Sequence, residues 1–185
     1  FKQQSQRFDT QVITEDITSV DFSSHPFKLK SSEGNDIEAL SVIIATGARA
    51  NWMNLPNEQR LAKTGGGVSA CAICDGALPG YRDKVLVVVG GGDSAIEEGI
   101  YLTKFASKVV LVHRRDELRA SPIMQERAKS NPKIEFKWNT VITDVLGDKI
   151  ISGIRIQDTI SKEESNLDCS GLFIAIGHTP NTSFL

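Results

Sequence analysis

The sequence predicts an α/β fold: a Rossmann-like, doubly wound nucleotide-binding domain with a flanking β-meander. From Lys84 the pattern runs strand, glycine-rich turn, helix, strand, in the stretches "KVLVVV", "GGGD", "SAIEEGIYLTKF" and "SKVVLVHRR". This order is typical of a βαβ unit in a parallel sheet. Residues 10–45 instead alternate apolar and polar residues in short runs, which are broken by turn signals such as "SEGND". Such alternation indicates antiparallel strands, so two kinds of sheet are expected.

The composition excludes several functional classes. The 185 residues are 40% hydrophobic and 24% charged, with a formal net charge of −2. This balance is ordinary for a globular protein and creates no overall field that would attract nucleic acid or an anionic membrane surface. The apolar runs are far shorter than the ~20 residues of a membrane-spanning helix, and the N-terminal stretch lacks a signal-peptide core. We therefore expect a cytoplasmic protein with neither a nucleic-acid nor a membrane partner.

The first 68 residues predict a meander followed by a linker. The meander is expected to end in a buried strand, Ser41 to Ala45, which runs into Thr46 and Gly47. A glycine there permits the sharp exit that a strand needs where a bulky ligand lies across its end. Residues 48–68 lack sustained periodicity and carry a proline and three glycines, which indicates a domain crossing.

Local signals predict the later elements. Ser94 and Glu97 fit a capping box for the helix after the glycine-rich turn, and Ser121 followed by Pro122 begins another helix. The runs "IEFKW", "TVITDVL" and "IISGIRIQ" alternate apolar and polar residues and predict a three-stranded meander. The run "GLFIAIG" predicts a last buried strand.

The stretch Gly90-Gly91-Gly92-Asp93-Ser94-Ala95 matches the dinucleotide fingerprint GxGxxG/A, and it lies between an apolar strand and a helix. In that fingerprint the first glycine makes the turn, the second lets the backbone approach a pyrophosphate, and the small Ala95 lets the helix pack on the strand. The helix N-terminus offers free N–H groups to the phosphates. The alternative is a tight strand-to-helix turn without a ligand.

The end of the next strand carries four candidate residues for the ribose end of the nucleotide: His113, Arg114, Arg115 and Arg119. An NAD-binding unit usually has an acidic residue at this place, for the ribose 2′-hydroxyl. Guanidinium groups instead bind a 2′-phosphate through charge-assisted hydrogen bonds, which favours NADPH. The alternative is a solvated basic run paired with Asp116 and Glu117.

Cys71 and Cys74 form a CxxC motif, which is followed directly by Asp75. One thiol of such a pair is easily deprotonated, and an adjacent carboxyl group supplies or accepts protons during thiol-disulfide exchange. A zinc site needs four ligands, and no second CxxC or closely spaced histidine pair is present, so we expect no metal. Inert buried thiols are the other alternative. An NADPH site and a dithiol in one chain call for a flavin between them, because nicotinamide transfers a hydride that thiols accept poorly.

Four motifs, in order, resemble the NADPH domain of low-molecular-weight thioredoxin reductases: "GGGVSACAICDG", "VVVGGGDSAIEE", "KVVLVHRRDELRAS" and "GLFIAIGHTPNT". The resemblance covers about residues 40–183. It implies two doubly wound domains, one for FAD and one for NADPH, joined by two crossings in a homodimer. It further implies that a hydride passes from NADPH to FAD, that the CxxC disulfide is then reduced, and that the dithiol reduces thioredoxin after the domains rotate.

The resemblance also assigns roles to residues. Cys71 and Cys74 would be the redox disulfide, with Cys74 nearer the flavin, and Asp75 would be the general acid. The pyrophosphate would lie against Gly90, Gly91, Gly92, Asp93, Ser94 and Ala95. Glu97 would lie close to the nicotinamide, His113, Arg114, Arg115 and Arg119 would bind the 2′-phosphate end, and Ile176 and Gly177 would border the cofactor. Ala45, Thr46 and Gly47 would touch FAD.

The family pattern also has parts that this sequence lacks, namely a first GxGxxG for FAD and a final Gly-Asp segment. Since the chain starts at Phe1, we expect a piece of a longer protein that binds FAD weakly or not at all. Its parts would be a partial FAD-domain segment (1–50), an NADPH-binding domain with the CxxC motif (51–178) and the start of the return crossing (179–185). Two alternatives are a peroxiredoxin-reducing flavoprotein and a non-catalytic NADPH-binding redox sensor. The arginines disfavour a relative that uses ferredoxin or reduced flavin.

Overall fold

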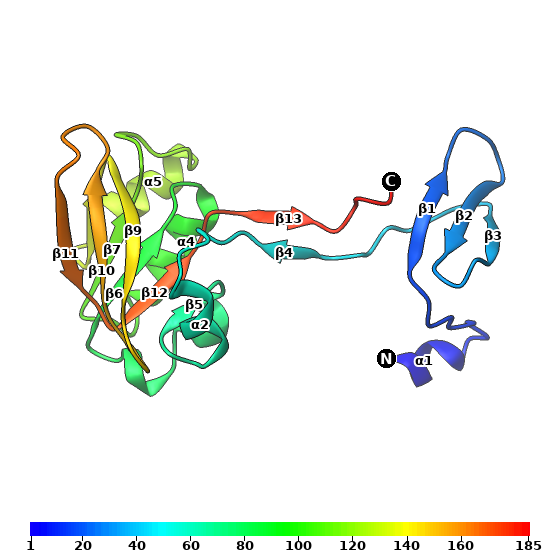
Figure 1. Ribbon diagram of the computed structural model, residues 1–185, viewed down its shortest axis with the longest axis horizontal. Coiled ribbons are helices and arrows are strands. Elements are labelled where there is room, and N and C mark those ends of the chain that lie inside the picture. Colours follow the sequence, from blue (N-terminus) through cyan, green and yellow to red (C-terminus); the bar gives the residue numbers. More distant parts are fainter. The chain divides into compact units, whose positions relative to one another are not determined.

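The computed structural model describes all 185 residues, which form two compact units. The small unit contains residues 1–49 and 180–185, and the large unit contains residues 50–179. The chain passes between them twice, through strands β4 (Ala48–Ala50) and β13 (His178–Pro180), which pair with each other (Figure 1). None of the helices has both the length and the apolar character needed to cross a membrane.

The small unit consists of a short helix and an antiparallel sheet. Its elements are α1 (Lys2–Gln6), β1 (Ile17–Asp21), β2 (Phe27–Ser31) and β3 (Asp36–Ala39). The sheet has the order β1-β2-β3, with Leu29 opposite Val20 on one side and Ile37 on the other. The meander predicted from the alternating pattern is therefore confirmed.

The prediction of a buried strand from Ser41 to Ala45 is wrong for this structure. These residues belong to no strand, and the side chain of Ile43 is 92% exposed. A strand needs hydrogen-bonded neighbours, and none of the three strands of the small unit pairs with this segment. Its apolar composition alone does not make it a strand.

The large unit is built on a parallel sheet in the order β5-β12-β6-β7-β8. Its strands are β5 (Val68–Ser69), β6 (Val85–Val89), β7 (Lys108–Val112), β8 (Ile134–Lys137) and β12 (Gly171–Ile174). The antiparallel strands β9 (Thr140–Gly147), β10 (Ile151–Asp158) and β11 (Glu164–Asp168) form a second sheet (Figure 1). The helical elements are α2 (Glu58–Lys63), α3 (Ala72–Asp75), η1 (Pro79–Tyr81), α4 (Asp93–Leu102) and α5 (Pro122–Lys129). The predicted α/β fold class is confirmed.

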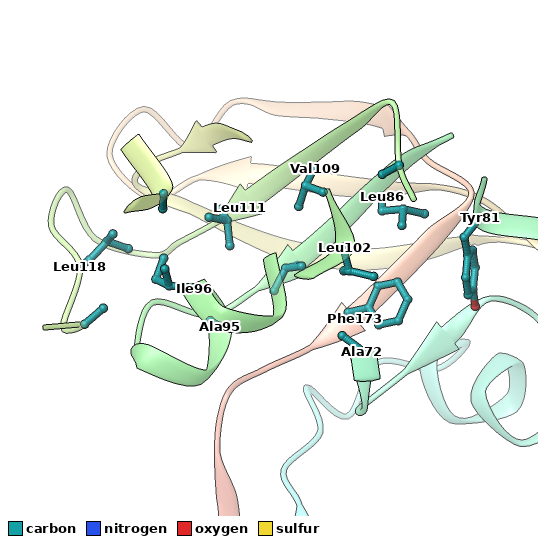
Figure 2. Packing of buried hydrophobic residues seen from close by; sticks show 14 residues of the cluster. Ala72, Tyr81, Leu86, Ala95, Ile96, Leu102, Val109, Leu111, Leu118 and Phe173 are labelled. Atoms are coloured by element: carbon teal, nitrogen blue, oxygen red, sulfur yellow. The ribbon is translucent and has the colours of Figure 1, made fainter. Parts of the chain in front are cut away.

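Side chains of the parallel sheet alternate between two cores. On one face Leu86 and Leu111 pack with Ile96 and Leu102 of α4, as Figure 2 shows. On the other face, the neighbouring residue Val87 belongs to a core that includes residues of β9 and β10. The parallel strands are therefore buried on both faces, which explains their continuous apolar runs.

Two local predictions for the large unit are wrong. The run "IEFKW" is not part of the meander but contributes β8 to the parallel sheet, because it directly follows the crossover helix α5. The meander consists of β9, β10 and β11. The capping box is also absent, because α4 has Gly92 rather than Ser94 as its N-cap residue, with no side-chain cap. Ser121 and Pro122 begin α5 as predicted.

Candidate functional site

A cavity of about 680 Å³ lies at the carboxyl ends of β6, β7 and β12 in the large unit. This end of a parallel sheet is where open α/β folds bind ligands. The candidate residues that line the cavity are Gly90, Gly91, Gly92, Asp93, Ser94, Ala95, His113, Arg114, Arg115, Arg119, Ile176 and Gly177. The structure therefore brings three separate motifs together around one cavity. Glu97, on an exposed part of α4, does not line it.

The glycine-rich turn is shaped by close packing. Gly90 has φ +151°, and a Cβ there would collide with the carbonyl oxygen of Ala175 at the end of β12. A Cβ at Gly91 would overlap the imidazole ring of His113, whereas at Gly92 it would meet nothing within 4 Å. The turn then leads into the first peptide N–H groups of α4, which suit an anion.

Asp93, the first residue of α4, holds the start of α5. Its Oδ1 accepts hydrogen bonds from the Ser121 peptide N–H at 2.8 Å and from the Ser121 hydroxyl at 2.9 Å. The Ser121 side chain is thus used between two helices rather than as a cap on its own helix. The resemblance places Asp93 at the pyrophosphate, and in the structure it also fixes the rim of the cavity.

The three arginines at the cavity are exposed and have no carboxylate partner. The ion pairs of the structure involve other residues, namely Lys108 and Lys137 with Glu135, and Arg155 with Asp144. The alternative in which Asp116 and Glu117 neutralise the basic run is therefore not found. The peptide N–H groups of Arg119 and Ala120 donate to the carbonyl oxygen of Gly91, at 2.8 and 3.1 Å, which ties the arginine loop to the glycine turn.

His113 is the one buried residue of the basic run, with 6% of its surface exposed. Its Nε2 atom is buried and has no hydrogen-bond partner. The pKa of His113 is lowered from its ordinary value, first because burial disfavours the charged ring and then because the nearby arginines repel a further positive charge. A neutral ring with an unpaired nitrogen therefore borders the cavity at neutral pH.

Sequence reasoning missed the cavity residues on the incoming crossing, Asn51 and Met53. The Asn51 peptide N–H donates to the Gly177 carbonyl oxygen at 3.0 Å, so the two crossings close this side of the cavity together. The Met53 peptide N–H donates to the fully buried carboxylate of Glu58, which also accepts the N–H groups of Asn54 and Leu55. No motif or periodicity in this stretch indicated these contacts. Thr140, Val141 and Ile142 of β9 were missed as well, because their alternating pattern predicted a strand but did not indicate that it borders the cavity.

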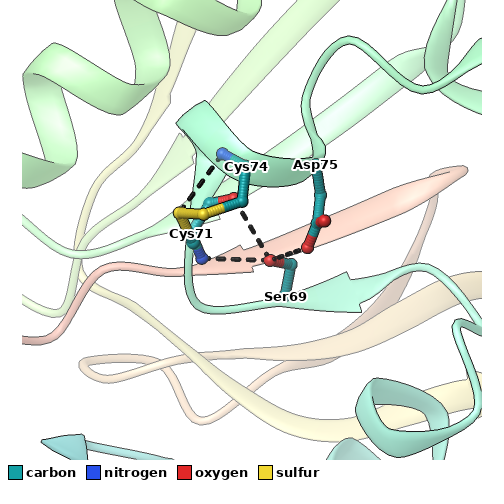
Figure 3. Close-up of a disulfide and its surroundings, with 4 residues drawn as sticks. All are labelled: Ser69, Cys71, Cys74 and Asp75. Carbon is teal, nitrogen blue, oxygen red and sulfur yellow. Dashed lines mark hydrogen bonds between the residues drawn. A yellow bond between two sulfur atoms is a disulfide. The ribbon is translucent and has the colours of Figure 1, made fainter. Parts of the chain in front are cut away.

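Cys71 and Cys74 form a disulfide, as the resemblance implies (Figure 3). Cys71 is the N-cap residue of α3, and its Sγ accepts the Cys74 peptide N–H at 3.2 Å. Cys74 is exposed and Cys71 is half-buried, which disagrees with the alternative of inert buried thiols. The third cysteine, Cys169, is buried and free, and burial raises the pKa of its thiol to about 12.

Asp75 lies at the end of α3, where its Oδ2 accepts a hydrogen bond of 2.6 Å from the Ser69 hydroxyl (Figure 3). The Ser69 oxygen in turn accepts the Cys71 peptide N–H at 3.0 Å. A single hydroxyl group therefore links the carboxylate to the backbone of the disulfide. The sequence motif included Ser69 but indicated no role for it.

The remaining candidates, Ala45, Thr46 and Gly47, lie in the small unit. Thr46 lines a separate cavity of about 580 Å³, together with apolar side chains such as Ile17 and Ile44, whereas Ala45 and Gly47 do not line it. Gly47 has φ +69°, and its carbonyl oxygen accepts the Asn181 peptide N–H at 3.0 Å. This unit has no glycine-rich strand-to-helix turn that would hold a dinucleotide pyrophosphate. The residues present therefore form at most part of an FAD site.

The chain is similar to several thioredoxin reductases. Thioredoxin reductase 2 of Arabidopsis thaliana is 49% identical over 192 residues, which cover all of this chain and 49% of that protein. Thioredoxin reductase 1 of Saccharomyces cerevisiae is 50% identical over 188 residues, covering 100% of this chain and 58% of that protein. The solved thioredoxin reductase of Giardia duodenalis has a TM-score of 0.85 at 38% identity, covering 100% of this chain and 59% of that one. This chain thus spans about half the length of the curated relatives it matches. Residues 2–185 match the family described as pyridine nucleotide-disulphide oxidoreductase, and the chain belongs to that family.

Proposed function

We propose that this chain carries the nucleotide and disulfide sites of an NADPH-dependent thioredoxin-disulfide reductase. The observation that carries the proposal is that one compact unit holds both a disulfide and a dinucleotide-type cavity bordered by three unpaired arginines. The relatives named thioredoxin reductase support thioredoxin as the acceptor of the electrons. A cytoplasmic location and a homodimer stay predictions of the sequence.

In this proposal the NADPH pyrophosphate lies against Gly90, Gly91 and the N-terminus of α4. Arg114, Arg115 and Arg119 bind the 2′-phosphate, which NADH lacks. If two guanidinium hydrogen bonds each contribute about 1.5 kcal/mol, NADPH is preferred over NADH by roughly a hundredfold. The lack of carboxylate partners supports this assignment, because these arginines need not give up ion pairs to bind the phosphate.

A flavin, when bound in the complete protein, converts the hydride of NADPH into electrons that a disulfide accepts. Because the small unit offers only part of an FAD site, the chemistry that we assign to this chain is confined to its own residues. Cys71 and Cys74 take up two electrons and become a dithiol. Asp75 exchanges protons with that pair, and the dithiol then reduces the disulfide of thioredoxin, so that the Cys71–Cys74 bond forms again.

Two measurements on this chain test the proposal. Fluorescence titration should give NADPH binding about a hundredfold tighter than NADH binding, and equal affinities would contradict the arginine assignment. In a second test the chain is reduced with dithiothreitol, freed of reductant and mixed with oxidised thioredoxin. Thioredoxin thiols should appear as the chain thiols disappear, and a Cys74→Ser chain should not complete the transfer. NADPH binding without any transfer would instead favour a redox sensor.

A further inference from the structure

The hydroxyl group of Ser69 lies at the centre of the hydrogen bonds around the disulfide (Figure 3). Its oxygen is 2.6 Å from Asp75 Oδ2, 3.0 Å from the peptide nitrogen of Cys71 and 3.3 Å from the carbonyl oxygen of Cys71. Ser69 is only 7% exposed, and it ends β5, where it pairs with Phe173 of β12. The sheet therefore fixes the position of this hydroxyl group.

A hydroxyl group has one proton to donate and two lone pairs that accept, so it suits both protonation states of a neighbouring carboxyl group. When Asp75 is ionised, Ser69 donates to Oδ2 and accepts the Cys71 peptide N–H. When Asp75 is protonated, its O–H donates to Ser69, and the Ser69 proton turns to the Cys71 carbonyl oxygen. The Cys71 N–H keeps its acceptor in both states, so neither state leaves a buried polar group unpaired.

We propose that Ser69 is a positioning residue of the disulfide centre, which holds the Asp75 carboxyl group in place while that group gives up and regains its proton. This proposal rests on the proposed function, in which the disulfide undergoes reduction with Asp75 as its proton donor. It goes beyond that function because it assigns a role to a residue outside the CxxC-Asp motif.

The step in which Ser69 takes part is the opening of the disulfide. The attacking thiolate forms a bond to one sulfur, the Cys71–Cys74 bond breaks, and its electron pair goes to the other sulfur. The leaving sulfur takes up one proton, which comes from Asp75. With dithiothreitol as reductant, its second thiolate then displaces the chain and closes the oxidised ring. Two electrons have passed to the chain, and Asp75 regains its proton from water.

Two other titratable side chains lie near this group, namely Tyr81 on η1 and Glu98 on α4, the helix that packs against α3. Tyr81 on η1 has a raised pKa because of burial and of the charge of Asp75. Glu98 on α4 lies near the Ala72 peptide, and mainly because of burial its pKa is raised to about 7. Since Glu98 titrates within the useful pH range, the test includes a variant that removes its charge.

The experiment measures how fast dithiothreitol reduces the Cys71–Cys74 disulfide in the complete 185-residue chain, without NADPH, flavin or thioredoxin. The rate constant is expressed per dithiothreitol thiolate and compared between about pH 5.5 and about pH 8. We expect it to rise toward low pH, because the leaving sulfur takes its proton from Asp75, and to stay flat in Asp75→Asn. Ser69→Ala should lower the value at low pH about fivefold to tenfold and change the value at high pH less than about twofold. Ser69→Thr, which keeps the hydroxyl group, should restore most of the loss.

The double variant Ser69→Ala/Asp75→Asn distinguishes the proposed positioning role of Ser69 from a purely structural one. If Ser69 acts through Asp75, adding Ser69→Ala to Asp75→Asn should change the rate constant less than about twofold. An equal loss at all pH values, or the same loss in the Asp75→Asn background, would overturn the proposal. The rise toward low pH should persist in Glu98→Gln, and its disappearance there would assign the effect to Glu98 instead. Because no nucleotide or thioredoxin is present, failure here leaves the tests of the proposed function untouched.

Discussion

The backbone of Gly91 lies directly against the imidazole ring of His113, so that any Cβ at position 91 would overlap the ring. This contact joins the glycine turn to the end of the neighbouring strand, where the arginines lie. The second glycine of the fingerprint is thus required by packing within the chain, in addition to the room that it leaves for a pyrophosphate.

Replacing Gly91 by alanine should therefore destabilise the large unit. The methyl group displaces a buried ring, and overpacking of this kind costs typically 1–3 kcal/mol of unfolding free energy. Urea denaturation measures the loss, and Gly92→Ala is the matched control because a Cβ there meets nothing within 4 Å. Equal stability of the two variants would show that the His113 ring moves without cost.

Arg114→Ala should weaken NADPH binding about tenfold, because one charge-assisted hydrogen bond to the 2′-phosphate is lost. The affinity for NADH should change less than about twofold, since NADH has no phosphate at that position. Isothermal titration calorimetry with both nucleotides separates the two effects. Arg127→Ala on α5 serves as control, because that arginine does not line the cavity.

Glu58→Gln should cost about 2–3 kcal/mol of unfolding free energy. The Glu58 carboxylate is fully buried and accepts three peptide N–H groups of the crossing, whereas an amide oxygen is a weaker acceptor and its NH₂ group faces donors. Guanidinium unfolding provides the measurement. The same exchange at the exposed residue Glu126 should alter the free energy by less than about 0.5 kcal/mol.

Glu98 should make the stability fall as the pH rises. Its pKa in the folded chain is about 7, above the ordinary value of 4.5, so the folded chain keeps a proton that the unfolded chain has already lost between these values. The free energy of unfolding is therefore highest below pH 4.5 and decreases as the pH rises to about 7. When the pH is raised from 4.5 to about 7, the free energy of unfolding of Glu98→Gln should increase by about 1 kcal/mol relative to that of the native chain. This value is smaller than the pKa difference alone would give, because solvent around the half-buried carboxyl group screens the effect. Urea unfolding at both ends of this pH range checks this, and parallel pH profiles of the two chains would refute it.

The parts of the fold that depend on residues adjacent in the chain could be predicted from the sequence. The strand, glycine turn and helix after Lys84 follow one another without interruption, and their own residues determine them. The arginines could be assigned to the cavity because the end of the next strand is adjacent to that turn in any βαβ unit. The prediction failed for the segment from Ser41 to Ala45, because a strand also needs a partner strand to hydrogen-bond with, and the composition of the segment does not reveal whether one is present.

The missed site residues depend on contacts between distant segments. Asn51 borders the cavity only because the incoming and outgoing crossings pair. A local sequence pattern does not predict pairing between such distant segments. Ser69 is close to Asp75 in sequence, yet its role follows from the way in which α3 turns back over the end of β5. Burial of Glu98 likewise requires the packing of α3 on α4. Sequence patterns therefore indicated the cysteines, the glycine turn and the arginines. The residues that position these groups could be found only in the structure.

The Gly91 carbonyl oxygen, which accepts two peptide N–H groups from the arginine loop, has a consequence for redesign. These two main-chain bonds, together with the buried side chain of Leu118, hold the loop, and none of these contacts involves the side chain of Arg114 or Arg115. Cofactor preference is therefore open to change by exchanging side chains at Arg114 and Arg115, with the loop length kept. A loop of another length would not keep the peptide N–H groups of Arg119 and Ala120 opposite the Gly91 carbonyl oxygen, so we expect it to disturb the glycine turn as well.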